Sequence, residues 1–265
     1  MVSILGYLSS VLIGVSLGLI GGGGSILTVP VLVYLIGLNP VLSTAYSLFV
    51  VGTTSLVGSF TYMKKRLVNY RAALVFAVPS FVTVFLTRKF IVPAIPDPVF
   101  TLGDFTLQKG AGIMGLFALI MLAAAFSMIR QRKDASDESE SSEVSFNLPL
   151  IALEGAAVGL LTGLVGAGGG FLIIPALVLL AKIPMKMAVG TSLLIIAAKS
   201  LIGFLGDLGQ QAIDWHFLTV FTLLSISGIF LGSYLTRFIS GEKLKRVFGW
   251  FVLGMAAVIL WKEFY

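Results

Sequence analysis

The sequence contains no cysteine and few charged residues. Without a thiol, the chain can form no disulfide, no thiolate nucleophile and no cysteine metal site. Only 11% of its residues are charged, whereas a soluble globular domain carries about 25%. With 57% hydrophobic residues and a mean hydropathy of +1.04, the chain has too little polar surface to face water on every side. These deficits predict an integral membrane protein.

The sequence also lacks the motifs of membrane enzymes and of nucleotide binding. Its single histidine, His216, belongs to no H-E-x-x-H zinc motif. The segment GFLGD at 203–207 has one residue too many for the glycine–aspartate motif of intramembrane aspartyl proteases, and no glycine follows Ser192 as it does in rhomboid-type proteases. GAGGGF at 166–171 fails the last position of the Rossmann pattern. We therefore predict a protein that is not an enzyme and that binds no cofactor or metal.

The net charge of +6 comes from short basic clusters between apolar runs. If all the runs cross the membrane and the N-terminus is outside, 13 basic residues fall on one side and 4 on the other (Arg88, Lys89, Lys109 and Lys262), with Lys199 left inside a run. By the positive-inside rule, the first side is cytoplasmic. We expect a multi-pass protein of a bacterial or archaeal cytoplasmic membrane with both termini outside. The partners predicted are lipid and a small solute, not nucleic acid.

Ten apolar runs are arranged in two sets of five. The first repeat covers 1–129, a polar Ser/Glu/Asp-rich linker that we expect to be cytoplasmic covers 130–147, and the second repeat covers 148–265. Because five crossings is an odd number, the second repeat would be inverted relative to the first. The second run of each set has only about 14 residues, and a full span needs about 20. Ten crossings, or eight crossings plus two re-entrant segments, are therefore both open; either is an all-α membrane fold.

A glycine-rich segment occurs twice in the chain. LIGGGGSILTVPVLV at 19–33 and LVGAGGGFLIIPALV at 164–178 match at 8 of 15 positions, including three glycines and a proline (Pro30 and Pro175). Glycine is a poor helix former, so we expect both helices to be broken there and to restart near Ser25 and Phe171. The free amides and positive dipole of two such helix starts would favour a small anion. Glycines spaced four apart elsewhere, such as Gly14 and Gly18, are more typical of close helix packing.

Lys199 is the ionisable residue placed deepest in an apolar run, and its counterpart in the first repeat is Thr54. Such a residue usually faces a cavity or a partner. Contact with an anion and an ion pair with Glu154 are both open, whereas Asp207 is expected in a loop. Hydroxyl residues on the third run of each repeat are further candidates. The predicted substrate-binding residues are Gly22, Gly23, Gly24, Ser25, Ser47, Thr53, Gly168, Gly169, Gly170, Phe171, Thr191, Ser192 and Lys199.

The chain resembles the TauE/SafE family of sulfite and organosulfonate exporters. The resemblance is carried by the glycine–proline blocks 21–30 and 166–175, by AVGTSL at 188–193 and by RVFGWFVL at 246–253. It implies a secondary transporter that exports a small sulfur-containing anion, and inverted repeats favour alternating access. An importer or channel for another small anion is the alternative, with an intramembrane enzyme third. The sequence leaves a homodimer open.

Overall fold

The computed structural model describes residues 4–102, 105–130, 148–179, 183–210, 212–235 and 241–264. Most of the predicted linker 130–147 lies outside them. In the first half the elements are α1 (Ile4–Ile20), the 3₁₀-helix η1 (Gly21–Leu27), α2 (Thr28–Pro30), the π-helix η2 (Val31–Leu35), α3 (Pro40–Lys64), α4 (Tyr70–Leu86), the π-helix η3 (Thr87–Ile91), α5 (Val92–Ala94), β1 (Phe100–Leu102), β2 (Phe105–Leu107) and α6 (Lys109–Arg130). In the second half they are α7 (Leu148–Val165), α8 (Gly170–Leu179), α9 (Met185–Asp207), α10 (Trp215–Leu235) and α11 (Gly241–Phe264).

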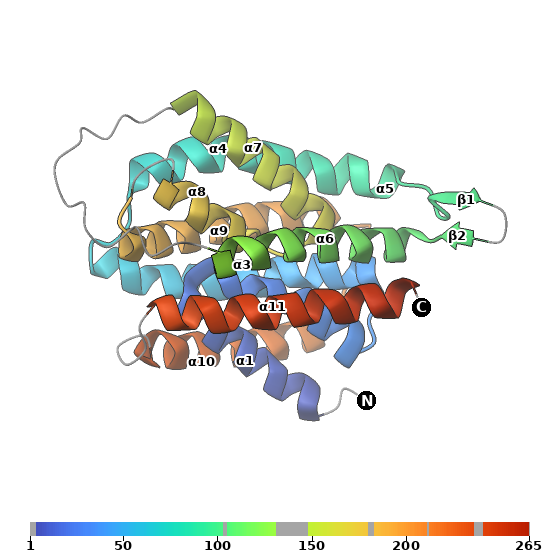
Figure 1. The fold of residues 1–265 in the computed structure, drawn as a ribbon, viewed down its shortest axis with the longest axis horizontal. Coiled ribbons are helices and arrows are strands. Elements are labelled where there is room, and N and C mark those ends of the chain that lie inside the picture. The colour runs from blue at the N-terminus through green and yellow to red at the C-terminus, as the bar shows by residue number, and fades with distance from the viewer. Residues whose placement is uncertain are drawn as a thin grey trace.

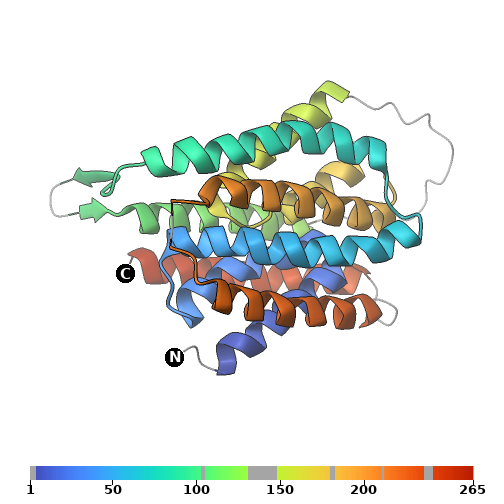
Figure 2. The ribbon, with the colours of Figure 1, turned by 180° about the vertical axis from the view of Figure 1, so that it is seen from behind.

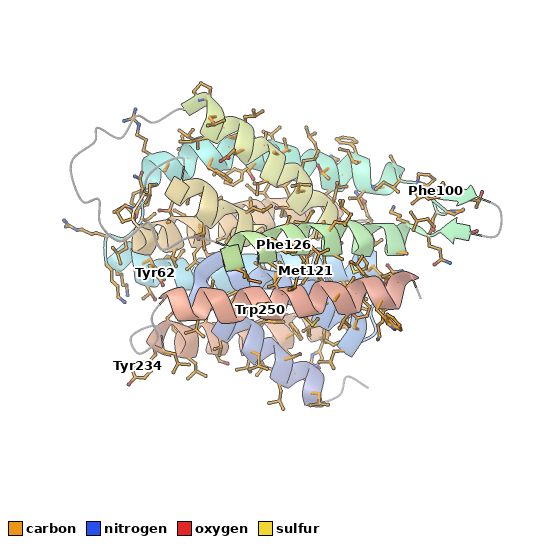
Figure 3. The ribbon with its side chains drawn as sticks, in the orientation of Figure 1. Tyr62, Phe100, Met121, Phe126, Tyr234 and Trp250 are labelled. Carbon is orange, nitrogen blue, oxygen red and sulfur yellow. The ribbon has the colours of Figure 1, made fainter. Side chains whose placement is uncertain are left out.

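The all-α membrane class is confirmed. Four described helices are long and apolar enough to cross a bilayer: Pro40–Lys64, Tyr70–Ala94, Met187–Asp207 and Trp215–Leu235. The outer surface of the bundle carries exposed aromatic side chains, among them Phe126, Tyr234 and Trp250 (Figure 3). Met121 is instead fully buried in the apolar cluster between α6 and α11. A surface this apolar suits lipid better than water.

The helices pack in pairs that respect the sequence duplication. Helix α1 packs on α10 and α4 packs on α7, while α3 packs on α9 and α6 packs on α11. A shift of 145 residues relates α1 to α7 and α4 to α10, so the α1–α10 pair is equivalent to the α4–α7 pair. Equivalent helices run in opposite directions: α1 begins and α11 ends at the end of the bundle with the β1–β2 hairpin, whereas α6 ends and α7 begins at the other end (Figures 1 and 2). Two inverted repeats would pack in this way.

Small residues allow the α1–α10 and α4–α7 pairs to approach closely. A side chain at Gly14 or Gly18 would overlap the backbone of α10. A side chain at Gly155, Gly159 or Gly163 would overlap α4 or its continuation η3. The packing interpretation of these spaced glycines is therefore confirmed.

The second apolar segment of each half is short in the structure as well. Helix α8 has 10 described residues, which is about 15 Å of helix, whereas the hydrocarbon core is about 30 Å thick. In the first half the chain turns back on itself after α1, so that Gly24 packs against Ser16 and Leu17. This segment nevertheless returns the chain to the end of the bundle where α1 begins, because Pro40 at the start of α3 lies against Gly110 at the start of α6.

Candidate functional site

The two glycine-rich segments meet in the middle of the molecule. Gly22 of η1 and Gly170 at the start of α8 touch through their backbones, and a Cβ on either residue would overlap the other. The side chain of Ile196 on α9 lies against both. Only glycine permits so close an approach of two backbones. The structure thus brings together the two segments in which the sequence predicts helix breaks.

The first segment is not the unwound turn that the sequence predicts. The chain leaves α1 at Gly21, which has a positive φ of 70°, and continues as the 3₁₀-helix η1; the α-helix restarts at Thr28, three residues after the expected position near Ser25. Ser25 is fully buried, and its Oγ donates a 2.7 Å hydrogen bond to the carbonyl of Gly22. The reason for the difference is that 3₁₀ hydrogen bonds satisfy amides that an unwound turn would leave bare.

The second segment is a true interruption. Gly166, Gly168 and Gly169 all have positive φ, at 74°, 64° and 64°. Helix α8 then begins at Gly170, one residue before the predicted start at Phe171. In its first turn the amides of Leu172 and Ile173 donate to the carbonyl of Gly169, and the positive end of the helix dipole points at the interruption.

Lys199 lies directly against this interruption. Its side chain is fully buried, and Nζ donates a 3.0 Å hydrogen bond to Oγ1 of Thr162 on α7. A Cβ on Gly169 would lie 2.6 Å from Nζ, so the ammonium group rests on the bare Cα of this glycine. The ion pair with Glu154 is not formed: Oε2 of Glu154 has no hydrogen-bond partner. Of the two alternatives for Lys199, the structure excludes this ion pair.

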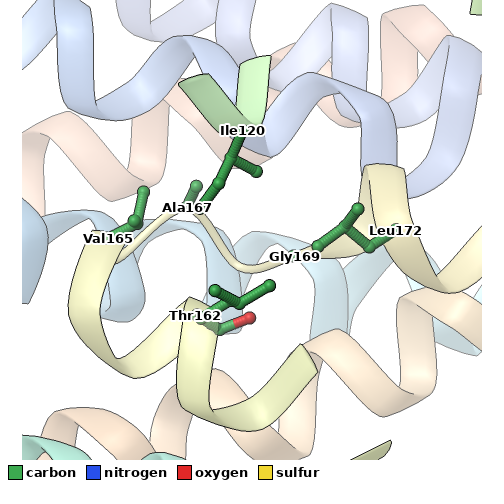
Figure 4. A pocket seen from close by; sticks show the side chains of 7 residues that line it. Ile120, Thr162, Val165, Ala167, Gly169 and Leu172 are labelled. Carbon is green, nitrogen blue, oxygen red and sulfur yellow. The ribbon is translucent and has the colours of Figure 1, made fainter. Parts of the chain in front are cut away.

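Positive charge converges at this junction. A buried ammonium group and the positive end of α8 converge on Gly169, and the side chain of Ser25 lies beside Gly168. A small cavity of about 10 Å³ borders Thr162 and Gly169 and is also lined by Ile120, Ala167 and Leu172 (Figure 4). This volume admits about one water molecule. In the described conformation this cavity therefore has no room for an oxyanion.

The remaining predicted residues lie in different places. Gly24 packs on α1, Gly23 lies within η1, and Thr53 is half-buried on α3. Thr191 Oγ1 accepts a 2.9 Å hydrogen bond from the amide of Asn69, and Ser192 Oγ donates to the carbonyl of its own helix. Both are about 10–12 Å from Lys199 along α9. The predicted grouping of Thr191 and Ser192 with Lys199 is not seen.

Ser47 lies toward the other end of α9. It is next to Leu48, which contacts Gly203. The hydroxyl of Ser47 is buried and has no hydrogen-bond partner.

Sequence reasoning missed three polar residues that the structure buries. Thr162 is the hydrogen-bond acceptor of Lys199, and the duplication gives a signal for it, because its counterpart in the first repeat is the apolar Leu17. Arg88 was counted among the basic residues of the outer side and Asp207 was expected in a loop. The expectation for Asp207 is wrong, because it is 3% exposed at the end of α9. Arg88 is fully buried, and the side of the membrane on which it lies stays a prediction. They form an ion pair, with 3.5 Å between Nη1 and Oδ1.

Comparison with known proteins identifies the relatives of this chain. A family model described as sulfite exporter TauE/SafE matches residues 7–259. The chain belongs to this family. A probable membrane transporter protein of Xylella fastidiosa strain 9a5c is 32% identical over 259 residues, which cover 95% of this chain and 92% of the relative. The probable membrane transporter protein YunE of Bacillus subtilis strain 168 is 28% identical over 230 residues, covering 82% and 81%. No solved structure matches the chain.

The TauE/SafE resemblance predicted from the glycine blocks is thus confirmed over nearly the whole chain. The protein is a membrane transporter of the TauE/SafE family. The printed names of these two relatives state membrane transport and no substrate. Both glycine segments and Lys199 lie within the range that the TauE/SafE model matches.

Proposed function

We propose that this TauE/SafE protein exports a small sulfur oxyanion, sulfite or an organosulfonate, across the cytoplasmic membrane by alternating access. The observation that carries the proposal is the fully buried ammonium group of Lys199 at the junction of the two glycine segments. Its hydrogen-bond partner in the structure, Thr162, is a neutral hydroxyl.

A charge at this depth is expensive without a counter-charge. Charged side chains inside a membrane usually pair with an opposite charge or line a pathway. Lys199 is not paired with Glu154, the acidic residue that the sequence analysis names as a possible partner. An oxyanion at Gly169 would neutralise Lys199 and accept hydrogen bonds from the start of α8. The substrate class follows from this positive, donor-rich junction and from the family.

The closed junction supports a carrier more than an open channel. The cavity beside Thr162 and Gly169 has room for about one water molecule, so an oxyanion must be admitted by a movement of the surrounding helices. Two inverted repeats that meet at a central site are the usual basis of alternating access. Outward movement of a negative charge is favoured by an interior-negative potential, by about 2.3 kcal/mol per charge per 100 mV.

Efflux from proteoliposomes tests the function. Vesicles containing purified protein are loaded with sulfite, sulfate, thiosulfate or sulfoacetate, and the initial rate of efflux is followed under an interior-negative potential. We expect saturable efflux of sulfite or of the sulfonate, and a roughly 30-fold lower kcat/KM in the Lys199→Met variant. If the wild-type protein moves none of these anions, the proposal is wrong. If Lys199→Met matches the wild type, the assignment of the site is wrong.

Cysteine labelling tests the proposed orientation, because the chain has no cysteine of its own. Gln108 precedes α6 and Lys65 follows α3, and both residues are exposed. A membrane-impermeant maleimide applied to whole cells should label Gln108→Cys at once and Lys65→Cys only after permeabilisation. The reverse pattern would place the termini in the cytoplasm.

A further inference from the structure

Arg88 joins the two halves of the molecule at a second buried polar group. It lies in the π-helix η3, where the α4 helix widens by one residue per turn. Its Nη1 donates a 2.9 Å hydrogen bond to Oγ1 of Thr44 on α3 and is 3.5 Å from Oδ1 of Asp207 on α9. Among the described residues, Arg88 is the largest side chain that is fully buried. Short π-helical segments within α-helices often mark functional sites.

The other edge of the Arg88 guanidinium group has no partner. Both Nε and Nη2 are buried and make no hydrogen bond. These two N–H groups point from the same edge of the planar group, so they form a fork that matches two oxygens of one oxyanion. Leaving charged donors buried and unsatisfied costs more than leaving neutral ones. The hydroxyl of Thr87, the neighbouring residue in η3, is also buried without a partner.

The stretch 163–169 connects the surroundings of Arg88 with Lys199. A Cβ on Gly163 would lie 2.6 Å from Cβ of Thr87, and one on Gly166 would overlap Thr44. Three residues later, Gly169 rests on Lys199. Along α9, Lys199 and Asp207 are eight residues apart, or about 12 Å. One short stretch of backbone therefore contacts the surroundings of both buried cations.

We propose that the Nε–Nη2 edge of Arg88 is a second binding station for the transported oxyanion, between Lys199 and the end of the bundle that carries the β1–β2 hairpin. This inference rests on the proposed function. Asp207 keeps the station weak: it holds Nη1 from the opposite edge, and its carboxylate repels the bound anion. A transported ion must bind firmly enough to enter a station and weakly enough to leave it. In the proposed orientation, this station is the last one before release outside.

The Arg88→Lys variant tests the station, because it keeps the charge and removes the two-pronged edge. We expect the initial rate of sulfite efflux from proteoliposomes to fall at least tenfold. The dissociation constant for sulfite at Lys199, measured by titration calorimetry, should stay within twofold. Lys89→Gln changes the adjacent exposed cation and should match the wild type in both measurements. Unchanged efflux in Arg88→Lys would overturn the inference.

A double variant separates binding from a purely structural ion pair. Removing both members of a buried pair is often tolerated, whereas removing one leaves a charge alone. We expect Arg88→Gln/Asp207→Asn to melt close to the wild-type temperature and still lose at least tenfold in efflux. Wild-type efflux in this variant would show that the pair only holds the helices together.

A measurement on the wild-type protein keeps the inference testable if the variants do not fold. Crystals soaked in selenite, which has the shape and charge of sulfite, should show an anomalous peak within hydrogen-bond distance of Nε and Nη2 of Arg88. A peak at Lys199 alone would overturn the second station and leave the proposed function standing. If the wild-type protein transports no oxyanion in vesicles, the proposed function itself fails.

Discussion

The first glycine segment, Gly21–Leu27, is a 3₁₀-helix that folds back on α1, whereas residues 166–169 interrupt the chain with three left-handed glycines. The surroundings differ as much as the backbones do. Shifted by 145 residues, Lys199 corresponds to Thr54 and Thr162 to Leu17, whereas Arg88 in LTRKFI corresponds to Arg237 in LTRFIS after a small insertion. At Lys199 the second repeat therefore carries a charge that the first repeat lacks. The comparison teaches that the first copy serves as a packing partner, while the second copy contacts the buried cations.

Gly169→Ala should have the largest effect on this comparison. Alanine at this position would have to adopt a left-handed backbone conformation, and its methyl group would displace both Nζ of Lys199 and Oγ1 of Thr162. Because misplacing a binding group by about 1 Å can cost a factor of about 100, we expect sulfite efflux to fall roughly 100-fold. Gly209→Ala is the matched control, since φ there is +84° and nothing lies within 4 Å of the added methyl. It should lose about 1 kcal/mol of stability and little transport. Equal losses in both variants would mean that backbone strain alone is responsible.

Lys199→Met and Thr54→Val compare the two equivalent positions on α9 and α3. Removing the charge should lower kcat/KM for sulfite by roughly 30-fold, because a hydrogen bond to a charged group contributes about 2 kcal/mol. Thr54 is buried with an unpartnered hydroxyl, so its isosteric replacement should change kcat/KM by about twofold at most. Equal losses would show that the two halves contribute equally to substrate binding.

Thr162→Val and Ser25→Ala compare the hydroxyl groups beside the two segments. Thr162 accepts the hydrogen bond of Lys199, and losing about 1 kcal/mol there should lower kcat/KM by roughly fivefold. Ser25 donates only to the carbonyl of Gly22 among the described hydrogen bonds, so its removal should lower the melting temperature slightly and leave kcat/KM within about twofold. A larger transport defect in Ser25→Ala would make the first segment a direct binding element.

Composition and duplication were sufficient to predict the membrane class, the family resemblance and the helix start near Phe171. They also singled out Lys199, because a lone cation in a long apolar run has few explanations. They did not predict the 3₁₀ conformation of Gly21–Leu27, since that depends on packing against α1 and on the contact with Gly170. Four consecutive glycines permit a 3₁₀-helix as readily as an unwound turn.

The burial of Arg88 and Asp207 was also beyond the sequence. Each lies near the end of its apolar run, where a charged side chain ordinarily reaches the interface. Only the crossing of η3 with α9 shows that the two charges face each other inside the bundle. Thr191 and Ser192 were misgrouped for a related reason: they share a helix with Lys199 but lie two turns away, and Thr191 is engaged by the start of α4.

The contact between Gly22 and Gly170 has a mechanical consequence. Where the side chains of two helices interdigitate, the helices can slide only if each side chain leaves the groove that it fills. At Gly22 and Gly170 the opposed surfaces are main chain without side chains, so the two segments can move past each other without such interlocking. Resistance to rocking then comes from the interdigitated side chains between α3 and α9, where a single larger side chain would hinder the movement.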